Sequence, residues 1–175
     1  YEFTYGDWSS DVCSSDLDLG CGTGLMGVPL RPRVGTLAGV DLAPRMVDKA
    51  RARHLYDHLD VGDVIDAMAV QAAAWDLLTA ADVLVYLGDL HPVMAAASHG
   101  LRPGGWFAAT VERLEEGQGD VVLGPARRYA HAESHIRAAA DAAGLAVRLL
   151  EPCSSRQERR QPVPGLVFVV ERVRN

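Results

Sequence analysis

The feature that most constrains this chain is a glycine-rich segment near its beginning, Asp18-Leu19-Gly20-Cys21-Gly22-Thr23-Gly24. Asp18-Leu19 is typical of the end of a buried strand, and residues 24–30 are typical of a short helix. Glycines between a strand and a helix allow a tight turn and leave no Cβ in the way of a ligand. Because open α/β sheets bind ligands at the carboxyl ends of their strands, the segment predicts a ligand site.

Short apolar runs alternate with helical patterns along the rest of the chain, which indicates parallel strands joined by crossover helices. The first of seven expected strands ends at Leu19, and the others span 34–40, 59–61, 75–80, 106–111, 145–150 and 166–170. Helices are expected at 24–30, 43–53, 64–73, 92–100 and 132–143. Arg102-Pro103-Gly104-Gly105 predicts a turn, and the polar stretch between residues 150 and 166, which holds Pro162 and Pro164, predicts a loop.

The first seventeen residues differ in character from the rest of the chain. Residues 7–17 resemble the translation of sequencing-adapter DNA. A carboxylate at Asp16 would also be costly to bury in a central strand, where apolar runs are usual. The alternative is a genuine polar N-terminal loop. We therefore expect residues 1–17 to be a non-native segment and residues 18–175 to form a single domain.

Charge and composition restrict the partners that this chain can have. Its formal net charge of -6 argues against nucleic acid, whose phosphates require a basic face. No apolar run reaches the length of a membrane span, and the three cysteines match no zinc or redox spacing. We therefore expect a cytoplasmic protein that acts on a small molecule or a protein, without nucleic acid, membrane or metal.

Two ligand classes fit the glycine segment. Residues 22–27 match the G-x-G-x-x-G pattern of dinucleotide-binding domains, and Asp41 lies where an acid would bind the ribose of either ligand. Asp18, two residues before Gly20, distinguishes the two classes by its charge. A carboxylate there would repel a pyrophosphate and attract a cationic amine and sulfonium, which favours S-adenosylmethionine.

At this point the sequence resembles a known family. Residues 18–24 resemble the first motif of class I S-adenosylmethionine-dependent methyltransferases, and the later motifs follow in family order at 39–46, 62–64, 75–84 and 101–105. The bacterial type-11 and type-12 methyltransferase groups are the most similar. This resemblance implies a Rossmann-like three-layer α/β sandwich whose mostly parallel seven-stranded sheet has an antiparallel last strand. It also implies S-adenosyl-L-methionine as cofactor.

The resemblance further implies which residues bind the cofactor. They are Asp18, Gly20, Cys21, Gly22, Gly24, Asp41, Leu42, Met46, Asp63, Val64 and Ala80. Asp41 would bind the ribose hydroxyls, and Asp63 with the amide of Val64 would hold the adenine. Each acid could instead cap a helix, and Met46 could simply fill the core. Cys21 is expected to be a small spacer because no basic residue close in sequence would activate its thiol.

Methyl transfer requires alignment and exclusion of water more than covalent help, so a catalytic triad is not expected. A hydroxyl acceptor would benefit from a base, for which Asp82, Tyr86 and His131 are the first candidates. Further candidates are His91, Glu112, Tyr129 and His135. Arg127-Arg128-Tyr129-Ala130-His131 either lines an acceptor pocket or forms a solvated entry to a helix. The segment after the fourth strand lacks the proline pair typical of enzymes that methylate nucleobase amines.

Three functions are therefore open. The first is methyl transfer from S-adenosylmethionine to a small molecule or a protein side chain. The second is an NAD-dependent oxidoreductase, suggested by residues 22–27. The third is an inactive fragment, because the helix that usually precedes the first strand and covers the cofactor is missing from this sequence. We accordingly expect the chain as given to bind the cofactor weakly.

Overall fold

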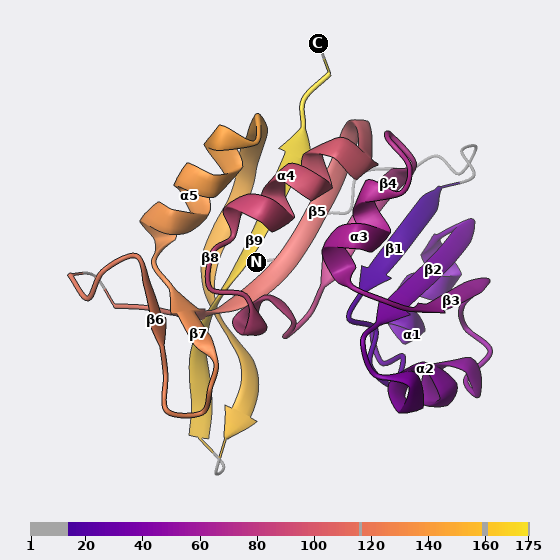
Figure 1. Ribbon diagram of the computed structural model, residues 1–175, viewed down its shortest axis with the longest axis horizontal. Coiled ribbons are helices and arrows are strands. Elements are labelled where there is room, and N and C mark those ends of the chain that lie inside the picture. The colour runs from indigo at the N-terminus through magenta and orange to yellow at the C-terminus, as the bar shows by residue number, and fades with distance from the viewer. Residues whose placement is uncertain (1–13, 116, 159–160, 175) are drawn as a thin grey trace.

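The computed structural model describes residues 14–115, 117–158 and 161–174. Within these ranges the chain forms one mixed sheet of nine strands flanked by helices (Figure 1). Five parallel strands lie in the order β3-β2-β1-β4-β5. They are β1 (Ser15–Leu19), β2 (Thr36–Asp41), β3 (His58–Val61), β4 (Trp75–Ala80) and β5 (Leu101–Arg113). Because the strand order reverses between β1 and β4, the carboxyl ends of these strands form the edge where such sheets bind ligands.

The sheet ends in antiparallel strands. β9 (Gln161–Arg172) pairs with β5 in the antiparallel sense, and β8 (Leu145–Glu158) pairs with β9 in the same sense. This arrangement confirms the prediction of a mostly parallel sheet with an antiparallel last strand.

The polar stretch between residues 150 and 166 is not the expected loop. β8 and β9 continue to pair there, with Ser154 opposite Pro164 and Gln157 opposite Pro162. β9 pairs with β5 only as far as Gly165, so both prolines lie where β9 has β8 as its one paired neighbour. Proline lacks an N–H and is tolerated at such an edge. The polar composition therefore reflects an arm that extends beyond the core.

Two short strands add to the seven that the sequence predicts. β7 (Tyr129–His131) runs parallel to the end of β5, and β6 (Val121–Leu123) pairs antiparallel with β7. The cluster at residues 127–131 was expected to lead directly into a helix. Instead its last three residues form β7, and the helix α5 (Glu133–Ala142) follows.

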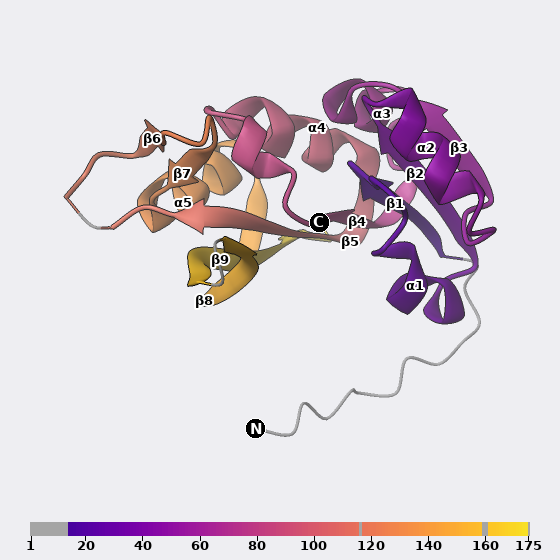
Figure 2. The ribbon, with the colours of Figure 1, turned by 90° about the horizontal axis from the view of Figure 1, so that it is seen from below.

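The helices cover both faces of the sheet. α3 (Val64–Ala69), α4 (His91–Gly100) and α5 lie along one face, whereas α1 (Gly27–Leu30) lies on the other (Figure 2). α2 (Pro44–Arg51) packs beside β2 and β3. α1 begins three residues later than expected because Gly24 has a φ of +80°, which a right-handed helix cannot contain. No helix in the described ranges combines the length and apolar character needed to cross a bilayer.

The turn expected at residues 102–105 lies inside β5. The register with β4 changes from Trp75 opposite Leu101 to Leu77 opposite Trp106, so β5 contains extra residues at this point. Gly104 has a φ of +86° there. The residues that were expected to form a turn therefore form a β-bulge, in which a glycine with a positive φ is common.

The hydrophobic core lies on both faces of the sheet, between the strands and the helices. Phe107 of β5 and Phe168 of β9 are fully buried and meet edge to face, with ring centroids 5.8 Å apart. Leu19 and Leu78, on neighbouring strands, are also fully buried.

Asp16 is a carboxylate near the start of β1. It pairs with Leu37 and Leu77 on the adjacent strands and is only 3% exposed. Burial, with a contribution from the charge of Asp76, raises the pKa of Asp16 to about 6. The sequence predicts that burying the Asp16 carboxylate in a strand costs free energy, and its burial and raised pKa agree with that prediction. Residues 7–13 of the adapter-like segment lie outside the described residues, and its non-native origin stays a prediction.

Candidate cofactor-binding site

The loop after β1 turns sharply at three glycines. Gly20, Gly22 and Gly24 have φ angles of +62°, +53° and +80°, which other residues adopt only with strain. The amide of Cys21 donates to the carbonyl of Val40 at 2.9 Å, which ties the loop to the end of β2. The predicted glycine turn is thus present at the carboxyl edge of the sheet.

Gly20 and Gly22 differ in what surrounds them. A Cβ on Gly20 would lie 2.4 Å from Cγ2 of Val83, whereas a Cβ on Gly22 would meet nothing closer than the carbonyl oxygen of Gly20 at 3.9 Å. Gly22 therefore faces open space, where a ligand can approach the backbone, and Gly20 is required by packing.

We expect Gly20→Ala to lower the free energy of unfolding by about 2–4 kcal/mol, because it combines a left-handed backbone with a steric clash. Gly22→Ala is the matched control, since it carries the same backbone penalty of about 1–2 kcal/mol without the clash. Urea denaturation of both variants measures the difference. Equal losses in the two variants would show that the contact with Val83 is irrelevant.

Asp41 connects the ends of two strands. Its Oδ2 accepts from the amide of Gly22 at 2.9 Å, and its Oδ1 accepts from the amide of Ala43 at 2.8 Å. The N-cap of α2 is Ala43, which makes no side-chain capping bond, so Asp41 does not serve as the cap. Its carboxylate lies partly exposed beside the open side of the loop and retains lone pairs for a vicinal diol.

Asp18 lies beneath the loop rather than on its surface. It is 1% exposed, and its carboxylate accepts from the hydroxyl of Tyr56 at 2.6 Å and from that of Thr79 at 3.1 Å. Burial raises the pKa of Asp18 to about 6, the two hydrogen bonds oppose that rise, and the charge of Asp41 adds to it. Its predicted influence on a ligand therefore acts through space and not by direct contact.

Asp63 caps a helix, which is the alternative that the sequence left open for it. It is the N-cap of α3, and its Oδ1 accepts from the amide of Ile65 at 2.7 Å. A role in holding adenine stays a prediction for Asp63 and for Val64, which is nearly buried.

Cys21 is buried. Burial and the charges of Asp18 and Asp41 raise the pKa of its thiol to about 12. This environment agrees with the expected spacer role, because the thiolate nucleophile is disfavoured.

Exposed apolar side chains lie at or just after the ends of β2 and β3, near Asp41. Leu42 is 69% exposed, and Met46 of α2 and Val61 at the end of β3 are also exposed. Met46 therefore does not fill the core. Such side chains at the ends of β2 and β3 provide an apolar surface beside Asp41, as a bound nucleoside requires. Ala80, at the end of β4, is buried and offers backbone only.

Three charged groups meet at the ends of β4 and β5. Nη1 of Arg156, on β8, lies 3.1 Å from Oδ1 of Asp82, and its Nη2 bonds to Oε1 of Glu112. Asp82 has a φ of +58°, and its amide donates to the hydroxyl of Thr110 at 2.9 Å. Asp82 and Glu112 are thus brought together at the carboxyl edge, as candidates for a base should be.

The remaining base candidates lie farther along this edge. Tyr86 is 59% exposed, and the guanidinium of Arg128 lies over its ring, 5.7 Å from the centroid. His131 is fully buried, and its Nε2 lies 2.9 Å from the carbonyl of Leu87 and 3.1 Å from that of Gly88. Because both partners are acceptors, Nε2 carries the proton. His131 therefore holds the loop after β4, and a role as base stays a prediction for this buried side chain.

His91, the first residue of α4, and His135 of α5 both lie beside Asp89. The amide of Leu90 donates to Nε2 of His135 at 3.2 Å, and Asp89 accepts from the amide of His91 at 3.0 Å. Both contacts satisfy amides at the beginning of α4, through the side chains of Asp89 and His135, and a role as base stays a prediction for both histidines. Tyr129 packs its ring against Gly88.

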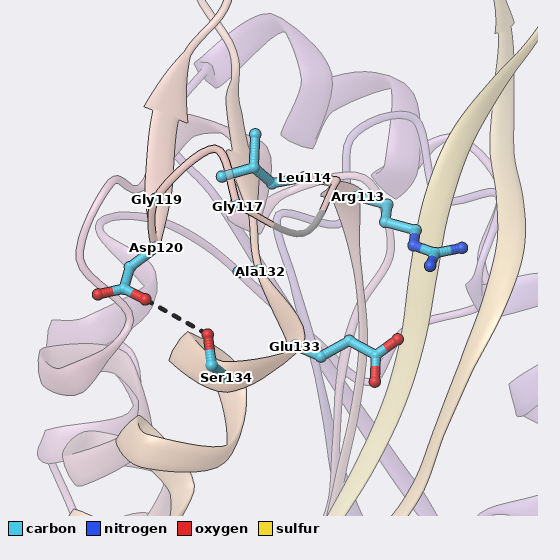
Figure 3. A pocket seen from close by; sticks show the side chains of 8 residues that line it. All are labelled: Arg113, Leu114, Gly117, Gly119, Asp120, Ala132, Glu133 and Ser134. Carbon is cyan, nitrogen blue, oxygen red and sulfur yellow. Dashed lines mark hydrogen bonds between the residues drawn. The ribbon is translucent and has the colours of Figure 1, made fainter.

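A shallow hollow lies between the loop after β5 and the start of α5 (Figure 3). Asp120 and Glu133 contribute carboxylates to it, and Ser134 donates to Asp120 at 3.3 Å. None of the predicted cofactor-binding residues lines it. It lies at the opposite end of the sheet from α1 and α2, which separates it from the glycine loop.

Sequence reasoning missed three residues that build this edge, namely Tyr56, Thr79 and Arg156. Thr79 could have been suspected, since it is a polar residue in an otherwise apolar strand end. Tyr56 and Arg156 follow no local motif, because Tyr56 lies 38 residues from Asp18, and Arg156 lies 74 residues from Asp82 and 44 from Glu112.

A comparison with protein families identifies the chain. The family described as "Methyltransferase domain" matches residues 17–107. The chain belongs to this methyltransferase family. The match begins at Leu17 and covers the glycine loop, Asp41, Asp63 and β4. It confirms the resemblance drawn from the motifs and favours a methyltransferase over an oxidoreductase.

Curated relatives of this methyltransferase domain include two O-methyltransferases. A ubiquinone biosynthesis O-methyltransferase from Xylella fastidiosa is 32% identical over 102 residues, which cover 55% of this chain and 42% of the relative. A malonyl-[acyl-carrier protein] O-methyltransferase from Serratia marcescens is 33% identical over 125 residues, 70% of this chain and 46% of the relative. The chain thus spans less than half the length of these relatives.

Solved structures show the same fold. An S-adenosylmethionine-dependent methyltransferase from Mesorhizobium loti superimposes with a TM-score of 0.71 at 18% identity, covering 91% of each chain. The 1,6-didemethyltoxoflavin-N1-methyltransferase of Burkholderia thailandensis, solved with S-adenosylhomocysteine, gives a TM-score of 0.73 at 19% identity over 91% of this chain and 71% of that one. The methyltransferase domain therefore has the predicted Rossmann-like α/β architecture.

Proposed function

We propose that this chain binds S-adenosylmethionine at the glycine loop and transfers its methyl group to a small molecule or a protein side chain. The observation that carries the proposal is the placement of Asp41, whose carboxylate is fixed to the loop by Gly22 and lies partly exposed beside it. Membership of the methyltransferase family supports the same conclusion.

The residues present fit this cofactor. The open backbone at Gly22 accommodates a ligand without a Cβ clash, and Asp41 offers acceptors for a ribose diol. Leu42 and Met46 provide an exposed apolar surface for the adenine. The buried carboxylate of Asp18 supplies negative charge beneath the loop, which favours a cationic ligand.

Bound S-adenosylmethionine supplies an electrophilic methyl group on a sulfonium, which is a good leaving group. The protein then has to orient the acceptor and exclude water. Asp82 and Glu112, which Arg156 holds together at the ends of β4 and β5, are the carboxylates placed to accept a proton from an acceptor.

A thermal-shift comparison of two ligands tests the proposed function. We expect S-adenosylhomocysteine at about 100 times its dissociation constant to stabilise the fold by about 2.7 kcal/mol, and so to raise Tm by about 5 °C or more. NAD at the same concentration should leave Tm unchanged. A rise in Tm with NAD and none with S-adenosylhomocysteine would establish the oxidoreductase alternative instead.

A further inference from the structure

Tyr56, between α2 and β3, has its ring in a slot formed by glycines. A Cβ placed on Gly27 would lie 2.8 Å from Cζ of Tyr56, and a Cβ on Gly39 would lie 2.9 Å from its Cε1. A Cβ on Gly24 would lie 3.1 Å from its Cε2. Side chains at Gly27 and Gly39 would clash with the ring, and one at Gly24 would crowd it.

The hydroxyl of Tyr56 joins two parts of the candidate site. It donates to Oδ2 of Asp18 at 2.6 Å, and it accepts from the amide of Gly27 at 3.1 Å. Asp18 lies on β1, and Gly27 is the first residue of α1. One side chain thus connects the acid before the glycine loop with the helix after it. Burial raises the pKa of Tyr56, so its hydroxyl remains a donor at neutral pH.

We propose that Tyr56 is a positioning residue of the cofactor site, which fixes the glycine loop between β1 and α1 and holds the Asp18 carboxylate in place by a hydrogen bond. The proposal rests on the proposed function, since it concerns the same cofactor. Tyr56 acts through its contacts with Asp18 and Gly27.

This role also explains the spacing at residues 22–27. In a dinucleotide-binding domain the glycines permit the backbone to approach a pyrophosphate and pack closely with the helix. Here Gly24 and Gly27 face the ring of Tyr56, and only Gly22 faces open space. The G-x-G-x-x-G pattern at residues 22–27, which suggested NAD, is therefore explained by the packing of Tyr56 against Gly24 and Gly27.

The ionisation of Asp18 gives the proposal a measurable signature. The groups around it are Tyr56, Thr79 on β4, Asp41 on β2 and the thiol of Cys21. The hydrogen bond from Tyr56 lowers the pKa of Asp18, and the charge of Asp41 raises it. Removing the hydroxyl raises the pKa of Asp18 further above about 6, so less of the carboxylate is ionised at neutral pH. A ligand with a positive sulfur then loses affinity, and a neutral thioether loses less.

The test compares S-adenosylmethionine with S-adenosylhomocysteine by calorimetry between pH 5.5 and 9 on the full chain. For Tyr56→Phe we expect about a tenfold loss of affinity for S-adenosylmethionine at pH 7, a smaller loss for S-adenosylhomocysteine, and a pH midpoint that moves upward. Thr79→Val removes the other hydrogen bond to Asp18 without disturbing the slot, and should move the midpoint in the same direction. Ser134→Ala, which removes a distant hydroxyl on α5, should leave the affinity for both ligands unchanged.

The possible results separate the two proposals. If the unmodified chain binds both ligands but Tyr56→Phe and Thr79→Val keep its affinity ratio and pH midpoint, the role of Tyr56 is refuted and the proposed function stands. If the unmodified, folded chain binds neither ligand, the proposed function fails and the role of Tyr56 fails with it.

Discussion

Replacing Asp16 with valine is expected to raise the free energy of unfolding at pH 7 by about 2–3 kcal/mol. Asp16 is 3% exposed near the start of β1, and burial raises its pKa from 3.8 to about 6. A difference of two pKa units corresponds to about 2.7 kcal/mol lost when the folded protein ionises this group. Valine removes that cost and adds buried apolar surface between Leu37 and Leu77.

The pH dependence of this effect has a definite sign. A carboxyl whose pKa is higher in the folded state binds its proton more tightly there, so its stabilising contribution is present below pH 3.8 and is lost as the pH rises through about 6. The advantage of Asp16→Val should therefore grow between pH 4 and pH 6.5, as measured by urea denaturation. Asp16→Asn, which removes the charge but keeps a polar group, should gain less. Equal stability of valine and aspartate at pH 7 would contradict the account.

The second prediction concerns Asp41. Asp41→Ala should weaken binding of S-adenosylhomocysteine by about 100-fold, because it removes charged hydrogen bonds to the ribose that are each worth about 1.5–3 kcal/mol. It also frees the amides of Gly22 and Ala43, which the carboxylate now fixes. Calorimetry measures the affinity, and the unfolding midpoint without ligand shows whether the fold is retained.

Asp48→Ala is the matched control for Asp41→Ala. Asp48 is an exposed acid on α2 that pairs with Arg51 at 2.8 Å, so its removal changes the net charge equally without touching the loop. Its ligand affinity should equal that of the unmodified chain. Equal losses of affinity in the two variants would mean that Asp41 contributes only through the overall charge of the protein.

The parts of the fold that the sequence predicts are those determined locally. The apolar run at residues 75–80 and the glycines at 20–24 specify a strand and a turn by their own conformational preferences, and both are found at these positions. Asp41 follows an apolar strand directly, so its place at the carboxyl edge could be foreseen.

The features that the sequence did not predict depend on pairing between distant segments. The arm formed by β8 and β9 is polar, and its strands are recognisable only once they lie side by side. β7 is three residues long and is defined by its contact with the end of β5. Asp18 was correctly placed in the sequence motif, but its burial follows from Tyr56 and Thr79, which no spacing rule connects to it.

Amide hydrogen exchange with and without S-adenosylhomocysteine tests most directly whether the glycine loop and the end of β2 bind the cofactor. The account predicts slower exchange in peptides that cover residues 19–28 and 41–47, and unchanged exchange around the hollow at residues 117–134. Protection confined to that hollow, or spread evenly over the chain while the ligand is bound, would contradict it.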